Sequence, residues 1–380
     1  MLSKLSIIET QYFTSMDAPS DQSLRVLAWP AFENRTGNPY NRLLYEAMEK
    51  EGTVIDEFTP ERLLTGEYDV WHLHWPENLL SICKLLDAML RIVGLFGLMV
   101  VARIRGIRIV WTVHNLDTHE QRHLLLERLF WTFFIPRIDG FISLSEVGLR
   151  QAEVRFPALR NISGFVVPHG HYRTAYPEAV LKDEARERLH LETDDRVMLY
   201  VGRIRPYKNV PRLIRAFRLI EDERARLLVV GESNDEVLQM TIAAEAAQDS
   251  RVQCELRFIP DDDLPIYLGT SDLVVLPYRN ILHSGAALLA LSFNRPVLVP
   301  DLGAMGELQT QIGHDWVQTY AGPLTHETLR EGLDWAVHTT RDSSTSDLDV
   351  LAWPTLARQT LTAYRAILSD DSQSSHTAGS

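Results

Sequence analysis

Two short segments of this chain carry side chains of the types that bind and transfer charged groups. Thr-Val-His at 112–114 ends one predicted strand, and VGRIRPYK at 201–208 ends another in the other half of the chain. His114 ionises near neutral pH, so it is suited to bonding a hydroxyl or assisting proton transfer. Arg203 offers a planar fork of donors and Lys208 a mobile point charge, and both bind phosphate oxygens. A histidine facing a diphosphate-binding pair favours transfer of a sugar from a nucleotide.

The setting of Arg203 and Lys208 favours phosphate binding over an ordinary surface pair. Both follow a predicted strand, Val197–Val201, and precede a predicted helix, Val210–Ile220. Gly202 allows the backbone to approach a ligand closely, and the helix adds the positive end of its dipole. An arginine and a lysine in a loop are usually a solvated pair, and that alternative stays open for the two residues taken alone.

A second candidate for phosphate binding is the segment LPYRNILHSGAALLAL at 276–291. Ser284 and Gly285 are suited to capping the apolar helix that follows, and the free amides there would hold a phosphate. The alternative is a capped core helix without a ligand. We assign Tyr278 and His283, from the same segment, to donor binding with them.

Two further residues are assigned to the donor on their position. Gly37 lies in the loop after the first strand and would let the backbone approach a phosphate from the opposite domain. Glu307 follows the last sheet strand and would contact the sugar or the ribose. The loop around Gly37 is not the glycine-rich dinucleotide fingerprint.

Polar residues crowd the chain directly after His114. Asn115, Asp117, His119 and Glu120 follow at once, a density that a structural turn does not require. We take His114 and Asp117 as candidate catalytic groups and His119 as a candidate acceptor contact. The alternative is that His114 is a structural histidine at the end of a strand.

The segment WHLHWPE at 71–77 also ends a predicted strand. Its two histidines alternate with Trp71 and Leu73, so they point to one face of the strand. His74 and Trp75 are predicted to bind an acceptor, with Trp75 stacking on a sugar ring, and Glu77 is a third catalytic candidate. The alternative is a buried aromatic corner with a solvated glutamate. No metal site is predicted, because spacing places no third ligand.

The elements that must position these residues alternate between strand and helix, which indicates an α/β protein with parallel sheets. With 380 residues the chain suits two doubly wound, Rossmann-like domains facing a central cleft. Ligands of such sheets bind at the carboxyl ends of the strands, where every segment above lies. We place the domains at 1–171 and 172–350, a helix at 351–368, and a disordered tail at 369–380.

Composition excludes some classes of protein. The formal net charge of -13 disfavours a nucleic-acid binder. The two cysteines, Cys83 and Cys254, lie far apart, which fits a reducing cytosol. The N-terminus lacks the apolar segment of a signal peptide. We therefore expect a cytoplasmic protein.

One apolar run, Ile92–Ala102, is flanked by arginines at 91, 103, 105 and 108. It is shorter than the roughly 20 residues of a membrane-spanning helix, so we favour a buried core helix. The alternative is a helix lying on an anionic membrane face, which would make the protein peripheral on the inner side of the cell membrane.

Together these residues resemble the GT-B glycosyltransferases, in particular those similar to family 4. VGRIRPYKNVPRLIRAF is the most specific stretch, and VVPHG is similar to an inter-domain segment of that family. The resemblance implies an acceptor-binding N-terminal domain, a C-terminal domain that holds a nucleotide sugar, and neither metal nor cofactor. It implies that Arg203 and Lys208 hold the diphosphate, that His114 lies near the transferred sugar, and that the last helix, near Trp353, crosses back to the N-terminal domain.

The chain departs from that family at two glutamates that usually contact the sugar and the ribose, because Ile281 and Leu289 stand at those positions. HLHWPE and LHSGAALLALSFNRP are instead similar to bacterial exopolysaccharide β-mannosyltransferases of the xanthan type. That resemblance implies GDP-mannose, a saccharide or lipid-linked acceptor, and inversion. Two alternatives stay open, namely a nucleotide-sugar epimerase on the same architecture and a non-catalytic partner subunit that binds the nucleotide sugar.

Overall fold

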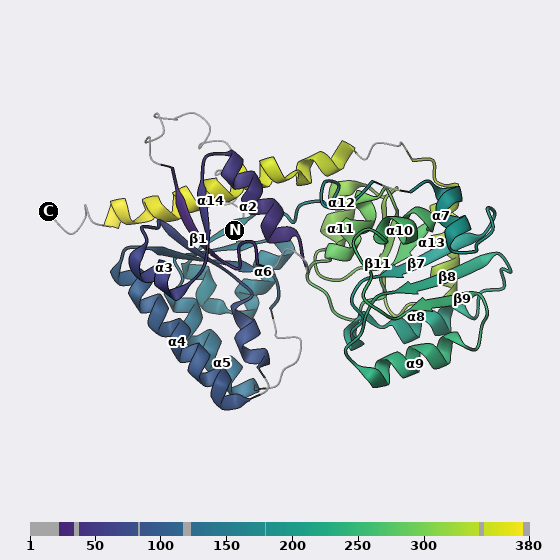
Figure 1. Cartoon of the computed structure of the whole chain (residues 1–380), viewed down its shortest axis with the longest axis horizontal. Coiled ribbons are helices and arrows are strands. Elements are labelled where there is room, and N and C mark those ends of the chain that lie inside the picture. Colours follow the sequence, from purple (N-terminus) through teal and green to yellow (C-terminus); the bar gives the residue numbers. More distant parts are fainter. Residues whose placement is uncertain are drawn as a thin grey trace, which may run out of the picture.

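The computed structural model describes residues 23–33, 38–82, 84–116, 123–178, 180–341 and 346–374. Within these residues the chain forms two α/β domains that lie side by side, each built around one parallel sheet (Figure 1). Three predicted site residues lie outside the described residues, namely Gly37, Asp117 and His119.

The first sheet has six parallel strands in the order β2-β1-β3-β4-β5-β6. Its strands are β1 (Arg25–Trp29), β2 (Val54–Glu57), β3 (Val70–His74), β4 (Arg108–Val113), β5 (Gly140–Ser143) and β6 (Ser163–Val166). The helices of this domain are α2 (Tyr40–Lys50), α3 (Pro60–Thr65), α4 (Leu85–Ile104), α5 (Leu124–Phe134) and α6 (Glu146–Arg155), with single 3₁₀ turns at Pro76–Ser81, Ile135–Arg137 and Pro157–Asn161.

The second sheet also has six parallel strands, in the order β12-β11-β10-β7-β8-β9. Its strands are β7 (Arg196–Val201), β8 (Ala225–Val230), β9 (Val252–Glu255), β10 (Leu273–Val275), β11 (Val297–Pro300) and β12 (Val317–Tyr320). Its helices are α7 (Lys182–Arg188), α8 (Val210–Phe217), α9 (Glu236–Ala246), α10 (Leu264–Thr270), α11 (Gly285–Ser292), α12 (Met305–Ile312) and α13 (His326–His338), with 3₁₀ turns at Pro206–Lys208 and Ser346–Leu351. The predicted doubly wound α/β fold is confirmed.

The strand order decides where the predicted site lies. In the second sheet the chain leaves β7 in one direction and returns to the other side as β10, so the loops after these two strands diverge and leave a crevice. The segment with Lys208 follows β7, and the segment with Ser284 follows β10. In the first sheet the same reversal separates β1 from β3, which ends at His74.

The last helix returns to the first domain. α14 (Trp353–Ser374) runs along α2, on the side of the first sheet away from α4 and α5 (Figure 1). The indole Nε1 of Trp353 donates to the carbonyl oxygen of His171 at 2.7 Å. α14 extends to Ser374, beyond the predicted end at 368, so residues 369–374 continue the helix that we expected to give way to a disordered tail.

Sequence patterning missed the elements that are short or polar. β2 and β12 have four residues each, too few to show an alternation. Helix α7 was not predicted, because all but one of its residues are polar or charged.

The long apolar helix differs from our expectation. We favoured a buried core helix, but α4 buries only one stripe, which includes Ile92 and Met99. Its opposite side exposes large apolar residues to solvent, namely Leu85, Leu86, Met89, Leu90, Val93, Val100 and Ile104. Among the described residues, α4 is also the one helix that is long and apolar enough to cross a membrane.

Candidate active site

The carboxyl edge of the second sheet brings two predicted donor-binding segments together around Gly202. A Cβ atom added to Gly202 would lie 3.6 Å from Lys208 Nζ and 3.9 Å from the Cβ of Ala286. Ala286 lies in the first turn of α11, so Lys208 and the amino end of that helix face the same small space. A lysine beside free helix amides is a site for an anion of phosphate size.

Lys208 is a cation in an unfavourable setting. Removal from water, followed by the charges of Arg205 and Arg203, lowers its pKa to about 8. Its Nζ lies 5.7 Å from the centre of the Tyr278 ring, and no described carboxylate forms an ion pair with it. A bound anion would relieve both the desolvation and the repulsion.

Arg203 opens onto a cleft of about 980 Å³, which Gly202, Glu232 and Leu289 also line. Its side chain is 55% exposed and forms an ion pair with Glu232 at 3.0 Å. The cleft depends on a close crossing of two strand ends, because a Cβ on Gly231 would lie 2.1 Å from the Gly202 carbonyl oxygen.

The amino end of α11 is capped as predicted. The Ser284 hydroxyl accepts from the Ala287 amide at 3.2 Å and is hydrogen bonded to the Tyr278 hydroxyl, also at 3.2 Å. A Cβ on Gly285 would lie 3.2 Å from the Tyr172 hydroxyl and 4.0 Å from His169 Nε2. The helix end therefore points at side chains that follow β6, the last strand of the first sheet.

On the first sheet, His114 follows β4 and is held by its neighbours. Its Nε2 lies 2.9 Å from Nδ1 of His74. The Trp75 ring stacks on the imidazole with centroids 4.1 Å apart, and Tyr40 meets it edge-on at 5.1 Å. Burial first, and then the neighbouring His169 and His283, lower the pKa of His114 well below its usual value. At neutral pH the imidazole is uncharged.

The Tyr40 ring contacts both His114, which follows β4, and His169, which follows β6. It lies 5.1 Å from the ring of His114 and 4.8 Å from that of His169. The Nδ1–H of His169 donates to the carbonyl oxygen of Gly170 at 2.8 Å, so its Nε2 is the acceptor. His114, Tyr40, His169 and the amino end of α11 thus form one continuous lining from the first domain to the second.

Glu77 is more buried than we considered. It is 4% exposed, and burial raises the pKa of its carboxyl group to about 7. The Asn115 amide donates to one carboxyl oxygen at 3.4 Å, and the other has no partner among the described residues. The alternative of a solvated glutamate is wrong. With a pKa of about 7, the carboxyl group of Glu77 can both accept and donate a proton at neutral pH.

The position of His74 changes its predicted role. We predicted that it binds an acceptor, but it is 1% exposed, and both ring nitrogens are occupied, Nδ1 by His114 and Nε2 by Tyr45 at 2.7 Å. It has no surface for an acceptor, so we replace that role with support of His114.

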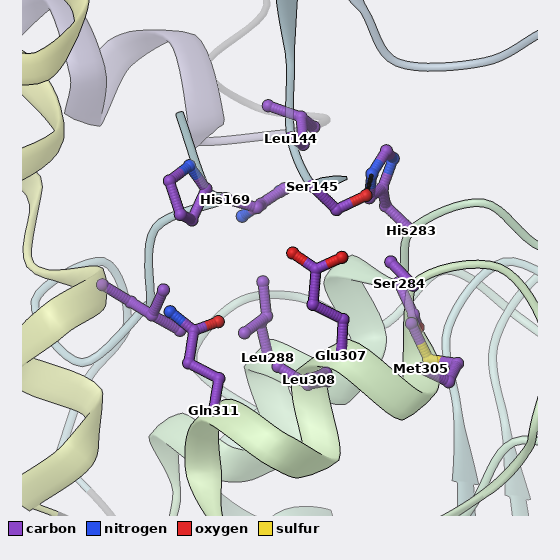
Figure 2. A pocket seen from close by; sticks show the side chains of 13 residues that line it. Leu144, Ser145, His169, His283, Ser284, Leu288, Met305, Glu307, Leu308 and Gln311 are labelled. Atoms are coloured by element: carbon purple, nitrogen blue, oxygen red, sulfur yellow. Dashed lines mark hydrogen bonds between the residues drawn. The ribbon is translucent and has the colours of Figure 1, made fainter. Parts of the chain in front are cut away.

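A small cavity lies between the domains, with His283 and Glu307 in its wall (Figure 2). The Glu307 carboxylate accepts from the backbone amides of Glu146 and Val147, at the amino end of α6. His283 Nε2 is hydrogen bonded to the Ser145 hydroxyl at 2.8 Å. Both residues thus contact the opposite domain, and their predicted roles with the donor stay predictions.

Sequence reasoning missed several residues of this lining. Tyr40 lies in α2 and has the pattern of a core residue, and Tyr172 lies in the segment between β6 and α7. His169 is part of VVPHG, and its position directly after a predicted strand was a signal that we did not use.

Three comparisons bear on this geometry. Residues 182–338 match the family described as glycosyl transferases group 1. A GDP-mannose:glycolipid 4-beta-D-mannosyltransferase of Xanthomonas campestris pv. campestris is 29% identical over 338 residues, which cover 89% of this chain and 91% of that protein. The chain has the GT-B fold, and its second domain is similar to the glycosyl transferases of group 1.

Solved structures agree on this fold. Sucrose-phosphate synthase of Thermosynechococcus elongatus superposes with a TM-score of 0.60 at 16% identity, covering 93% of this chain and 99% of that one. Anabaena HepE in complex with UDP gives a TM-score of 0.57 at 16% identity, covering 93% and 100%. The matched family segment includes Arg203, Lys208 and α11, so the donor-side prediction and the family evidence fall on the same domain.

Proposed function

We propose that this glycosyltransferase moves mannose from GDP-mannose to a saccharide or lipid-linked saccharide acceptor in polysaccharide or glycoconjugate synthesis. The observation that carries the proposal is the similarity to the GDP-mannose:glycolipid mannosyltransferase, which runs through both domains. It includes the side that we predict to bind the acceptor as well as the donor side.

The cationic site supplies the chemistry that the leaving group needs. The acceptor oxygen attacks the anomeric carbon, the bond from that carbon to the diphosphate breaks, and GDP leaves with the electron pair. Lys208, Arg203 and the amino end of α11 would stabilise the charge that develops on the diphosphate. We propose that these groups act without a metal ion or cofactor.

Inversion would require a base for the proton of the acceptor hydroxyl. His114 and Glu77 are the described candidates, and Asp117 is the third. His114 is uncharged at neutral pH, and Glu77 has a pKa of about 7, so each is partly or wholly in a form that accepts a proton.

We also propose that the exposed apolar side of α4 and α5 lies on an anionic membrane. Leu90 and Val93 on α4, and Leu125 and Leu129 on α5, are exposed on neighbouring helices. Exposed arginines at 91, 103 and 128 lie on the same two helices, and Arg105 directly follows α4, although the whole chain carries -13. Apolar side chains with an arginine fringe match the interface of an anionic bilayer. The protein would then be cytoplasmic and peripheral on the inner face of the membrane.

Transfer is tested by incubating the purified protein with GDP-mannose and lipid-linked saccharides, with UDP-glucose as the donor control. We expect GDP release that depends on an acceptor and persists with EDTA. Conversion of the donor sugar without an acceptor would indicate the epimerase. Binding of GDP-mannose with no turnover on any acceptor would indicate the partner subunit.

Membrane binding is tested separately by flotation with vesicles. We expect the protein to float with vesicles that contain phosphatidylglycerol, and less with phosphatidylcholine alone. Leu90→Glu should reduce flotation, whereas Leu219→Glu should not, since Leu219 lies in the other domain with the matching exposure of 61% against 63%. Equal flotation of the two variants would contradict the proposal that this side of α4 and α5 binds the membrane.

A further inference from the structure

A continuous chain of hydrogen bonds runs from α14 to His114. The Tyr364 hydroxyl lies 2.5 Å from Nδ1 of His72, and the Tyr45 hydroxyl lies 2.9 Å from the same nitrogen. Tyr45 also lies 2.7 Å from His74 Nε2, and His74 Nδ1 lies 2.9 Å from His114 Nε2. The four residues before His114 come from α14, β3 and α2, and all are buried. The position of each proton therefore depends on that of the next.

The distances favour one arrangement of the protons at the α14 end. A neutral imidazole has one nitrogen that donates and one that accepts, and the accepting nitrogen has one lone pair in the ring plane. Nδ1 of His72 is reached by two hydroxyls, and Tyr364 is the closer at 2.5 Å. With Tyr364 donating to Nδ1, the Nε2–H of His72 donates to the Thr112 hydroxyl at 2.7 Å.

The rest of the chain follows from that assignment. Because Tyr364 occupies the lone pair of His72, the acceptors left for the Tyr45 proton are Nε2 of His74, at 2.7 Å, and the Tyr364 hydroxyl oxygen, and we assign the proton to Nε2 of His74. His74 then carries its own proton on Nδ1 and donates it to His114 Nε2. His114 must accept at Nε2, so its proton lies on Nδ1.

We propose that His74 is a positioning residue that holds His114 as the Nδ1–H tautomer. In this tautomer His114 donates a hydrogen bond from Nδ1 to an oxygen of the bound sugar, and it is not the base that takes the acceptor proton. The base is then a carboxylate, for which Glu77 is the described candidate. This inference rests on the proposed function and on the expectation, from the family resemblance, that His114 lies near the transferred sugar.

The sharpest activity test is a pair of variants that differ by one group. The side-chain nitrogen of Asn occupies the place of a histidine Nδ1, so His74→Asn keeps a donor toward His114. His74→Asp offers only acceptors there and forces the proton of His114 onto Nε2, with the lone pair on Nδ1. We expect His74→Asn to keep kcat within about threefold of wild type and His74→Asp to lower it at least tenfold, a factor of ten being 1.36 kcal/mol, with little change in KM for the acceptor.

The reverse ranking would overturn the proposal. If His114 were the base, a carboxylate behind it would strengthen it, and His74→Asp would be the more active variant, with a pH profile extended to higher pH. Equal loss in both variants, with equal melting temperatures, would indicate a purely structural His74 and would also overturn it.

A spectroscopic measurement tests the tautomer without any substrate. In protein with ¹⁵N-labelled histidine, His114 is assigned by comparison with His114→Gln, and its proton is located from the ring nitrogen shifts and couplings. We expect it on Nδ1 in the wild type. Tyr364→Phe frees the lone pair of His72 from α14, so we expect both tautomers in that variant. A wild-type proton on Nε2 would overturn the inference whether or not the enzyme uses GDP-mannose, whereas failure of GDP-mannose transfer alone would overturn only the proposed function.

Discussion

The two sheet edges that face each other across the cleft are both formed by the carboxyl ends of parallel strands, but their chemistry is opposite. At the edge of the first sheet, His72, His74 and Tyr45 are buried and bonded to one another. At the edge of the second, Lys208 lies beside free helix amides with no carboxylate partner among the described residues. One edge has its hydrogen bonds paired within the protein, and the other offers unpaired groups that an anion would complete.

Burial explains the difference. A neutral imidazole or phenol is stable in a protein interior once its donors and acceptors are paired. A lysine in the same position keeps its charge only against the desolvation that lowers its pKa to about 8. The first edge is therefore suited to orienting hydrogen bonds, and the second to binding and releasing a diphosphate.

Among the tests of this difference between the two edges, we expect the largest effect on turnover at Lys208. Replacement by Met keeps much of the volume and removes the charge, so we expect turnover to fall about 100- to 1000-fold. The melting temperature without ligand should not fall, because the lost group is a desolvated cation. Steady-state kinetics and thermal denaturation measure the two quantities.

Lys50→Met is the matched control, because Lys50 is exposed at the end of α2. It should change neither quantity. Wild-type turnover in Lys208→Met would show that the second edge does not act through this cation.

The next effect concerns the neutral histidines of the cleft and acid stability. Burial lowers the pKa of His72 and His283 to about 3 and of His169 to about 4. Below pH 6.5 the unfolded chain binds protons that the folded chain does not, so stability is lost as pH falls, by up to about 1.4 kcal/mol per pH unit for each histidine.

Glu77 acts in the opposite direction. In the folded protein the pKa of Glu77 is about 7, above the value of 4.5 in the unfolded chain. Its stabilising contribution is therefore lost as the pH rises between these two values. It offsets the pH dependence that about one histidine produces. We expect the free energy of unfolding in urea to be several kcal/mol smaller at pH 5 than at pH 7. His283→Gln should reduce that pH dependence by about one proton, and His338→Gln, at an exposed site, should not. Equal stability at pH 5 and pH 7 would contradict the burial of these histidines in their uncharged form.

The smallest effect concerns the contact that joins the edges. Glu307→Gln removes the negative charge at the amino end of α6, which is worth about 0.3–1 kcal/mol. We expect a decrease of that size in the free energy of unfolding, together with a larger radius of gyration in small-angle scattering. Glu331→Gln, on the exposed side of α13, is the control. A variant as compact and stable as the control would indicate that the domains are held together elsewhere.

The contrast also explains which site residues could be predicted. Lys208, Ser284 and His114 follow apolar strands, and the carboxyl ends of parallel strands meet at one edge of a sheet. Tyr40 could not be predicted, because it starts an amphipathic helix whose pattern assigns it to the core. The same limit applies to Tyr364, whose partner His72 is nearly 300 positions earlier, at a sequence separation of 292.

The sequence also could not predict which side of α4 stays exposed. The pattern of α4 is apolar all round, so it indicates burial but cannot say on which side or against what. Packing against β4 and α3 covers one stripe, and the rest is left to solvent or to a membrane.

The sequence by itself determined the two parallel sheets, the strand ends at which ligands bind, and the residue types that favour a sugar nucleotide, because each of these follows from local patterns of a few residues. Only the tertiary structure decided that His74 is buried behind His114, that Glu77 is held near its titration point, and that Glu307 contacts the opposite domain. Burial, hydrogen-bond partners and pKa depend on which distant segments surround a side chain, and no short stretch of sequence contains that information.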